Sequence, residues 1–241
     1  MGDSLAQTLT PETALLWHQY LLTDAQGRRA HTLTALREFV RALQADSEER
    51  QRRFAETFCH RVADAGDMLP LREPLFAGII GPFLVSAHQK GEKDAGRWLA
   101  YFQPHFINMP PSQRLIDPVD ALSPITLLTE AFRRDPDDTR TQDLLIRTLA
   151  GHFAYAVHEV PSGVLYGVNG ATVAECRKWE DDLALFHEVV QKRQVVEEHE
   201  VAMHYWGFHF HGYADYLTHR EQYQSYADYV EQHWETKGAT G

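Results

Sequence analysis

The stretch LTALREFVRAL, residues 33–43, decides the fold class of this chain. Its apolar side chains recur at spacings of three and four residues, whereas a β-strand would need strict alternation. The apolar members are Leu33, Leu36, Phe39, Val40 and Leu43, and the charged members on the other side are Arg37, Glu38 and Arg41. We therefore predict an amphipathic helix here that ends near Asp46.

The first half of the chain carries further helix signals around this stretch. Thr10-Pro11 combines an N-cap with a proline at the first helical position, and Ser47 can cap another helix. Gly81-Pro82 removes a backbone hydrogen bond and should bend a largely buried helix. The helices predicted in this half span 11–22, 33–46, 47–66, 74–89 and 92–102.

The second half is predicted to be helical in the same way. Ser123-Pro124 opens a helix, Asp135-Pro136 breaks it, and Thr172 with Glu175 forms a capping box. The helices predicted in this half span 123–134, 138–158, 172–191, 195–218 and 219–234. Only residues 160–170 are rich in turn and strand signals. The fold class is therefore predicted to be all-α, with about ten antiparallel helices in a bundle or a curved stack that is similar to helical repeats.

The domain organisation depends on the connection between the two halves of the chain. Residues 103–120 contain four prolines and few periodic residues, which is typical of a long connection. We predict a single helical domain over 1–236, with a break between two subdomains near 103–120 as the alternative. Residues 237–241 are predicted to be a disordered tail.

The charge is acidic and unevenly distributed. The formal net charge is −11, which argues against a nucleic-acid partner because neutralising phosphates needs a basic surface. Residues 1–120 carry 13 Lys and Arg against 15 Asp and Glu, whereas residues 121–241 carry 10 against 19. The second half also holds 9 of the 14 histidines and 8 of the 10 tyrosines. This composition suits a protein partner with a basic surface, although negative charge could also serve solubility alone.

The segment EEHEVAMHYWGFHFHGYAD, residues 197–215, contains the candidate binding residues. On a helical wheel, five acidic and histidine side chains fall within an arc of about 60°. These are Glu197, Glu200, His204, His211 and Asp215. The opposite face holds Ala202, Tyr205, Trp206, Tyr213, Tyr216 and Leu217, and it should be buried. The acidic stripe is therefore expected to face water and to contact the partner.

A metal site is the alternative interpretation of this stripe. Carboxylates and imidazoles at helical spacing are typical of metal-binding helical bundles. The zinc-protease pattern fails, however, because His199 and His204 are five residues apart and point about 140° away from each other. A metal-dependent hydrolase or oxygenase would use Glu200, His204 and His211, together with His152. Elemental analysis of the purified protein separates the two interpretations.

Other chemistry-bearing residues are predicted to be structural. His209 projects from the apolar face and is expected to be a hydrogen-bonded core residue. His152 is the exception: it lies among apolar neighbours, so burial should lower its pKa unless a carboxylate pairs with it, and it could be a general base as well as a structural residue. Glycines 163, 167 and 170 lack the strand and the lysine of a phosphate loop. Cys59 and Cys176 are expected to be small core side chains.

The sequence thus predicts a non-catalytic protein-binding module without metal or cofactor. It would be an adaptor, or an inhibitor that occludes a basic active-site cleft as immunity proteins do for nuclease toxins. A small-molecule sensor with a pocket beside Pro82 is a further alternative. The absence of a basic and apolar leader, of a long apolar stretch and of paired cysteines predicts a cytoplasmic protein without membrane contact.

Overall fold

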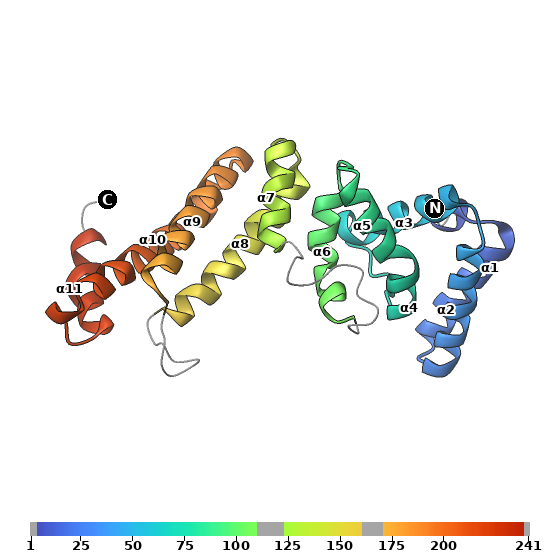
Figure 1. Cartoon of the computed structure of the whole chain (residues 1–241), viewed down its shortest axis with the longest axis horizontal. Helices are drawn as coiled ribbons and strands as arrows, with labels where there is room; N and C mark the ends of the chain where they lie inside the picture. The colour runs from blue at the N-terminus through green and yellow to red at the C-terminus, as the bar shows by residue number, and fades with distance from the viewer. Residues whose placement is uncertain (1–3, 110–122, 161–170, 239–241) are drawn as a thin grey trace. The chain divides into compact units, whose positions relative to one another are not determined.

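The computed structural model describes residues 4–109, 123–160 and 171–238, and these form helices joined by turns and short loops (Figure 1). Within the described ranges no residue is in a strand, so the predicted all-α fold class is confirmed. None of the described helices combines the length and the apolarity that crossing a lipid bilayer requires.

The chain divides into two compact units, Met1–Ala131 and Phe132–Gly241, and the division falls inside α7 (Pro124–Arg134). Each unit encloses buried aromatic side chains of its own. The single domain and the alternative break near residues 103–120 stay predictions, because residues 110–122 lie outside the described ranges.

Two helices of the N-terminal unit begin at caps that the sequence provides, and one helical segment ends at a predicted glycine. Thr10 Oγ1 accepts the backbone N–H of Thr13 at 3.2 Å, and Ser47 Oγ accepts that of Arg50 at 3.4 Å. Gly66 has a positive φ of 73°, which terminates a helical segment. The elements before α7 are η1 (Ala6–Thr8), α1 (Pro11–Ala25), α2 (Arg29–Gln44), α3 (Glu48–Cys59), η2 (His60–Asp64), α4 (Glu73–Leu75), η3 (Phe76–Ile80), α5 (Gly81–Gln89) and α6 (Ala95–Ile107).

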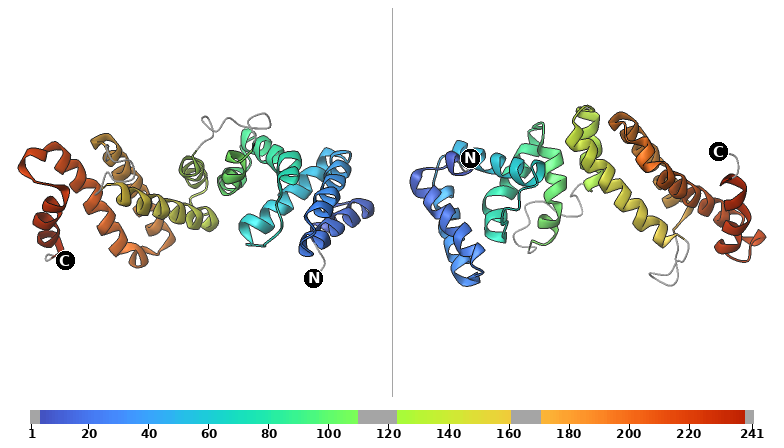
Figure 2. Two further views of the ribbon diagram at one scale, coloured as in Figure 1. Left: turned by 90° about the horizontal axis from the view of Figure 1, so that it is seen from below. Right: turned by 180° about the vertical axis from the view of Figure 1, so that it is seen from behind.

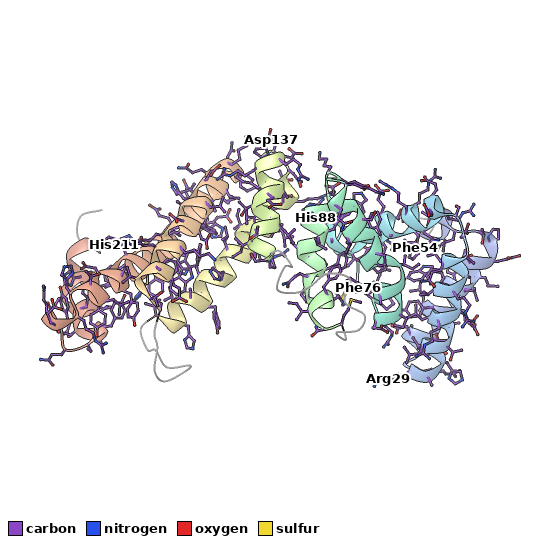
Figure 3. The ribbon with its side chains drawn as sticks, in the orientation of Figure 1. Arg29, Phe54, Phe76, His88, Asp137 and His211 are labelled. Carbon is purple, nitrogen blue, oxygen red and sulfur yellow. The ribbon has the colours of Figure 1, made fainter. Side chains whose placement is uncertain are left out.

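An aromatic cluster forms the centre of this unit. The ring of Trp17 lies 5.1 Å from that of Phe39 and 5.4 Å from that of Phe54, and all three side chains are fully buried (Figure 3 labels Phe54). These side chains come from α1, α2 and α3, so the cluster joins three helices that are consecutive in sequence.

The helix predicted over residues 74–89 contains a π-helical turn, η3, just before Pro82. Proline has no N–H and cannot bond to the carbonyl group of Gly78, four residues earlier. Gln44 Nε2 of α2 donates a hydrogen bond to that carbonyl oxygen at 3.2 Å instead. The Gly81-Pro82 step is therefore accommodated by a wider turn and by a side chain from a neighbouring helix.

Helix α6 corrects the prediction of a short helix over residues 92–102. It starts at Ala95 and continues through Pro104 to Ile107, so the first part of the predicted connection is helical. Phe102 and Phe106 lie one turn apart and are both buried. Their burial offsets the hydrogen bond that Pro104 cannot make.

The C-terminal unit consists of longer helices. Its elements after α7 are α8 (Thr139–Glu159), α9 (Val173–Arg193), α10 (Val196–Thr218), η5 (Arg220–Gln222) and α11 (Tyr226–Gly238). The predicted capping box is present, because Thr172 and Glu175 each bind the other's backbone N–H. The helix predicted over 219–234 begins later, since Ser225 caps α11 by accepting the N–H of Asp228. Residues 239–241 of the predicted tail lie outside the described ranges.

Helix α9 packs antiparallel to both α8 and α10, and α11 packs against α10 (Figures 1 and 2). The core beneath α11 is made largely of tyrosines. It contains Val160, Cys176, Phe208, Tyr213, Tyr216, Tyr226 and Tyr229. Tyrosine adds a hydroxyl group to an apolar ring, so this core needs polar partners as well as packing.

The close approach of α10 and α11 should make Gly212→Ala destabilising. A Cβ atom at Gly212 would lie 2.9 Å from Cε1 of Tyr229, whose ring is buried and stacked on His233. We expect the free energy of unfolding to fall by about 1–3 kcal/mol, as measured by chemical denaturation.

Gly151→Ala is the matched control, because Gly151 is exposed in α8 and a Cβ atom there would meet nothing within 4 Å. It should raise the free energy of unfolding by about 0.5–1 kcal/mol through helix propensity. An equal gain from Gly212→Ala would contradict the packing described for α10 and α11.

Candidate functional site

Helix α10 carries all five candidate residues along its length. Glu197, Glu200, His204 and His211 are exposed, and Asp215 is half-buried (Figure 3 labels His211). Eighteen residues separate the first from the last, which is about 27 Å at 1.5 Å per residue. The predicted stripe is therefore a line of separate sites and not one compact cluster.

The C-terminal residues of the stripe, His211 and Asp215, contact other side chains of the same unit. His211 Nδ1 lies 3.0 Å from Glu180 Oε1 on α9. The carboxylate of Asp215 accepts a hydrogen bond from the Tyr229 hydroxyl group at 3.1 Å and lies 3.0 Å from His219 Nδ1. These two residues thus help to hold α9, α10 and α11 together.

The N-terminal part of the stripe lies between two hollows of the surface. One hollow, of about 570 Å³, lies between α9 and α10. The other, of about 680 Å³, lies between α10 and Trp234 of α11. Glu200 and His204 line both hollows, so we call the residue pair the α10 ridge.

Exposed apolar and aromatic side chains border the α10 ridge on the α11 side. Val201 is 84% exposed, Tyr205 42% and Trp234 37%. The Tyr205 and Trp234 rings lie 5.9 Å apart between centroids with their planes at 81°. Glu198 and Glu200 line the same hollow. Carboxylates and partly exposed aromatic rings thus lie side by side next to the α10 ridge.

The exposure of Tyr205 corrects the prediction that it belongs to the buried face. Tyr213 and Tyr216, further along α10, are buried in the core that α11 covers. The Trp234 ring of α11 lies 5.9 Å from the Tyr205 ring, and 42% of Tyr205 stays exposed beside it. Sequence reasoning also missed Trp234, because no local signal shows where the end of α11 meets α10.

The tyrosines of the C-terminal half are mainly core residues and not surface residues. Tyr213, Tyr216, Tyr226 and Tyr229 are buried, whereas Tyr155 and Tyr205 are exposed. Tyr213 and Tyr216 are buried as predicted, whereas the expectation that the tyrosines of this half contribute to a binding surface is wrong for Tyr226 and Tyr229. The rings of all four provide the apolar area that α10 and α11 share.

The metal interpretation gains no geometric support in the described part of the chain. No three His, Cys, Asp or Glu side chains there come together as a metal-binding group. His152 faces α9, where Asp182 raises its pKa and Lys178 lowers it. Burial lowers the pKa of His152 more strongly than either charge shifts it.

His209 is a hydrogen-bonded core residue, as predicted. It is buried, and its Nδ1 lies 2.9 Å from the Tyr226 hydroxyl group. Burial lowers the pKa of His209 because the charged imidazolium loses hydration. The side chain therefore links α10 to α11 in its neutral form.

Three further predictions concern residues outside the α10 ridge. A surface hollow of about 660 Å³ lies beside Pro82, between α3 and α5, where the sensor alternative expects a pocket. Cys59 and Cys176 are buried free thiols whose pKa values are raised by burial. Glycines 163, 167 and 170 lie outside the described residues.

Lowering the pH should destabilise the contact between α10 and α11 that His209 makes. Its pKa is lowered in the folded state, so the unfolded state binds the proton more readily. Stability conferred by neutral His209 is fully present above the unfolded pKa of about 6.5 and is lost as pH falls below it.

We expect His209→Gln to be less stable than the wild type at pH about 7.5 and to lose less stability towards pH about 5. Chemical denaturation at a series of pH values measures both effects. Parallel pH profiles for the two proteins would contradict a neutral, buried His209.

Comparison with known proteins finds no matching family model, no matching curated protein and no matching solved structure. The residues of the chain itself therefore carry the functional argument. The feature with the clearest chemistry is the α10 ridge together with the neighbouring Glu198 and the partly exposed rings of Tyr205 and Trp234.

Proposed function

We propose that the chain is a non-catalytic protein-binding module whose C-terminal unit binds a basic segment of another protein. The observation that carries the proposal is the exposed group of Val201, Tyr205 and Trp234 beside Glu198 and Glu200. Aromatic side chains in partly open pockets are typical anchors of protein interfaces.

The charge of the unit supports a basic partner. Residues 132–241 carry 18 Asp and Glu against 10 Lys and Arg, a balance of −8. Several basic side chains of the unit are already paired, since Arg193 binds Asp143 and Lys192 binds Asp137, each at 2.7 Å. Among the described residues, no lysine or arginine forms an ion pair with Glu198 or Glu200, and the net negative charge of the unit would attract a basic segment.

An adaptor, or an inhibitor similar in principle to an immunity protein, would use such a surface. The same acidity disfavours nucleic acid and anionic lipid as partners. Two buried free thiols suit the reducing cytoplasm, which is the proposed location. Glu197, Glu200 and His204 form the proposed contact region, whereas His211 and Asp215 support it from within the unit.

A pair of designed helical peptides tests this proposal. Both carry leucine on one face, and the other face carries arginine in the first peptide and glutamate in the second. We expect the full chain to bind the arginine peptide more tightly, and we expect the affinity to fall between about 50 mM and about 500 mM salt. Fluorescence anisotropy of the labelled peptides measures both differences.

The double variant Glu198→Gln/Glu200→Gln should weaken binding of the arginine peptide by about threefold or more. Asp181→Asn/Glu221→Gln is the matched control, because it removes two exposed charges elsewhere in the same unit. Equal affinity for the two peptides, or affinity that does not change with salt, would refute the proposal.

A further inference from the structure

The hollow between α10 and Trp234 has walls suited to a planar cation. The Tyr205 and Trp234 rings are in edge-to-face contact, with their centroids 5.9 Å apart and their planes at 81°, so together they form one aromatic wall of the hollow. The hollow of about 680 Å³ is also lined by Glu198 and Glu200. Aromatic faces and carboxylates both attract positive charge.

The rings are held in place from beneath. The Trp234 ring lies 4.6 Å from that of Phe208 and is stacked on His209 with an interplanar angle of 24°. Tyr205 packs against His209 at 4.5 Å between ring centroids. His209 is in turn bonded to Tyr226. The walls are thus fixed by core residues before any ligand arrives, which lowers the entropic cost of binding.

Among the described residues, no lysine or arginine side chain enters the hollow. Arg193 lies near enough to feel the charge of Glu198, but its Nε binds Asp143 at 2.7 Å. The described lining residues thus leave the carboxylates of the hollow open to a positive charge from a binding partner.

We infer that this hollow binds an arginine side chain of the basic protein partner. The guanidinium group is planar, stacks on aromatic faces, and binds carboxylates through two parallel hydrogen bonds. An ammonium group is more strongly hydrated and gains less from an aromatic wall. This inference rests on the proposed function and adds the chemical group that anchors the partner.

The probe that tests the inference is N-acetyl-arginine amide, with N-acetyl-citrulline amide as its uncharged counterpart of nearly the same shape. The full chain is labelled with ¹⁵N, and the Trp234 indole signal is assigned from its loss in Trp234→Phe. At pH about 8, which keeps imidazole rings neutral, we expect a saturable shift of this signal with the arginine probe. Citrulline should produce a much smaller shift.

Two variants test the aromatic wall and the acidic wall of the hollow separately. Tyr205→Leu and Glu200→Gln should each weaken binding of the arginine probe by about twofold to fivefold. Their matched controls are Tyr155→Leu on α8, which removes another exposed tyrosine, and Glu221→Gln. Circular dichroism confirms that each variant keeps the helical content of the wild type.

The outcomes distinguish the inference from the proposed function. Equal shifts with arginine and citrulline, or no shift of the Trp234 signal, would overturn the arginine site. If the arginine-bearing helical peptide still binds in a salt-dependent way, the proposed function remains and only the arginine site is rejected. If neither the peptide nor the small probe binds, both are rejected.

Discussion

The packing of α11 across α10 is the constraint on which the candidate site depends. Gly212 allows the ring of Tyr229 to approach the α10 backbone, and His209 bonds to Tyr226 deeper in the same contact. These contacts fix the direction of α11, whose far part then carries Trp234 to the side of Tyr205. An aromatic wall at the surface is thus positioned by hydrogen bonds and close packing within the core.

A long-range electrostatic attraction and a short-range aromatic contact both act near the α10 ridge. The net negative charge of the C-terminal unit acts over roughly a Debye length, about 8 Å at physiological salt, and would guide the proposed basic partner towards the surface. Tyr205 and Trp234 act only at contact, where a desolvated cation gains more from an aromatic face. Charge alone would attract many basic proteins, whereas the aromatic wall formed by the two rings would favour a group that stacks on it.

The local features of the fold follow from sequence, and the tertiary ones do not. Caps such as Thr10 and Thr172 act within one helical turn, so the sequence identifies the beginnings of α1 and α9. Helix α6 passes through Pro104 because buried phenylalanines on both sides of it stabilise the longer helix. In the site, helical periodicity is enough to place Glu200 on an exposed face. The pairing with Trp234 depends on where α11 ends along α10, which no local pattern encodes.

The tyrosine core also lowers the stability of the C-terminal unit at alkaline pH. Burial, with a contribution from Asp215, raises the pKa of Tyr229 to about 12, and burial raises the pKa of Tyr226 still further. Tyrosines in the unfolded chain release their protons near pH 10, so above that pH the unfolded state gains ionised phenolates that the core excludes. The hydroxyl groups of Tyr226 and Tyr229, which join α10 to α11 at neutral pH, therefore favour unfolding in strong base, because they ionise more readily in the unfolded chain.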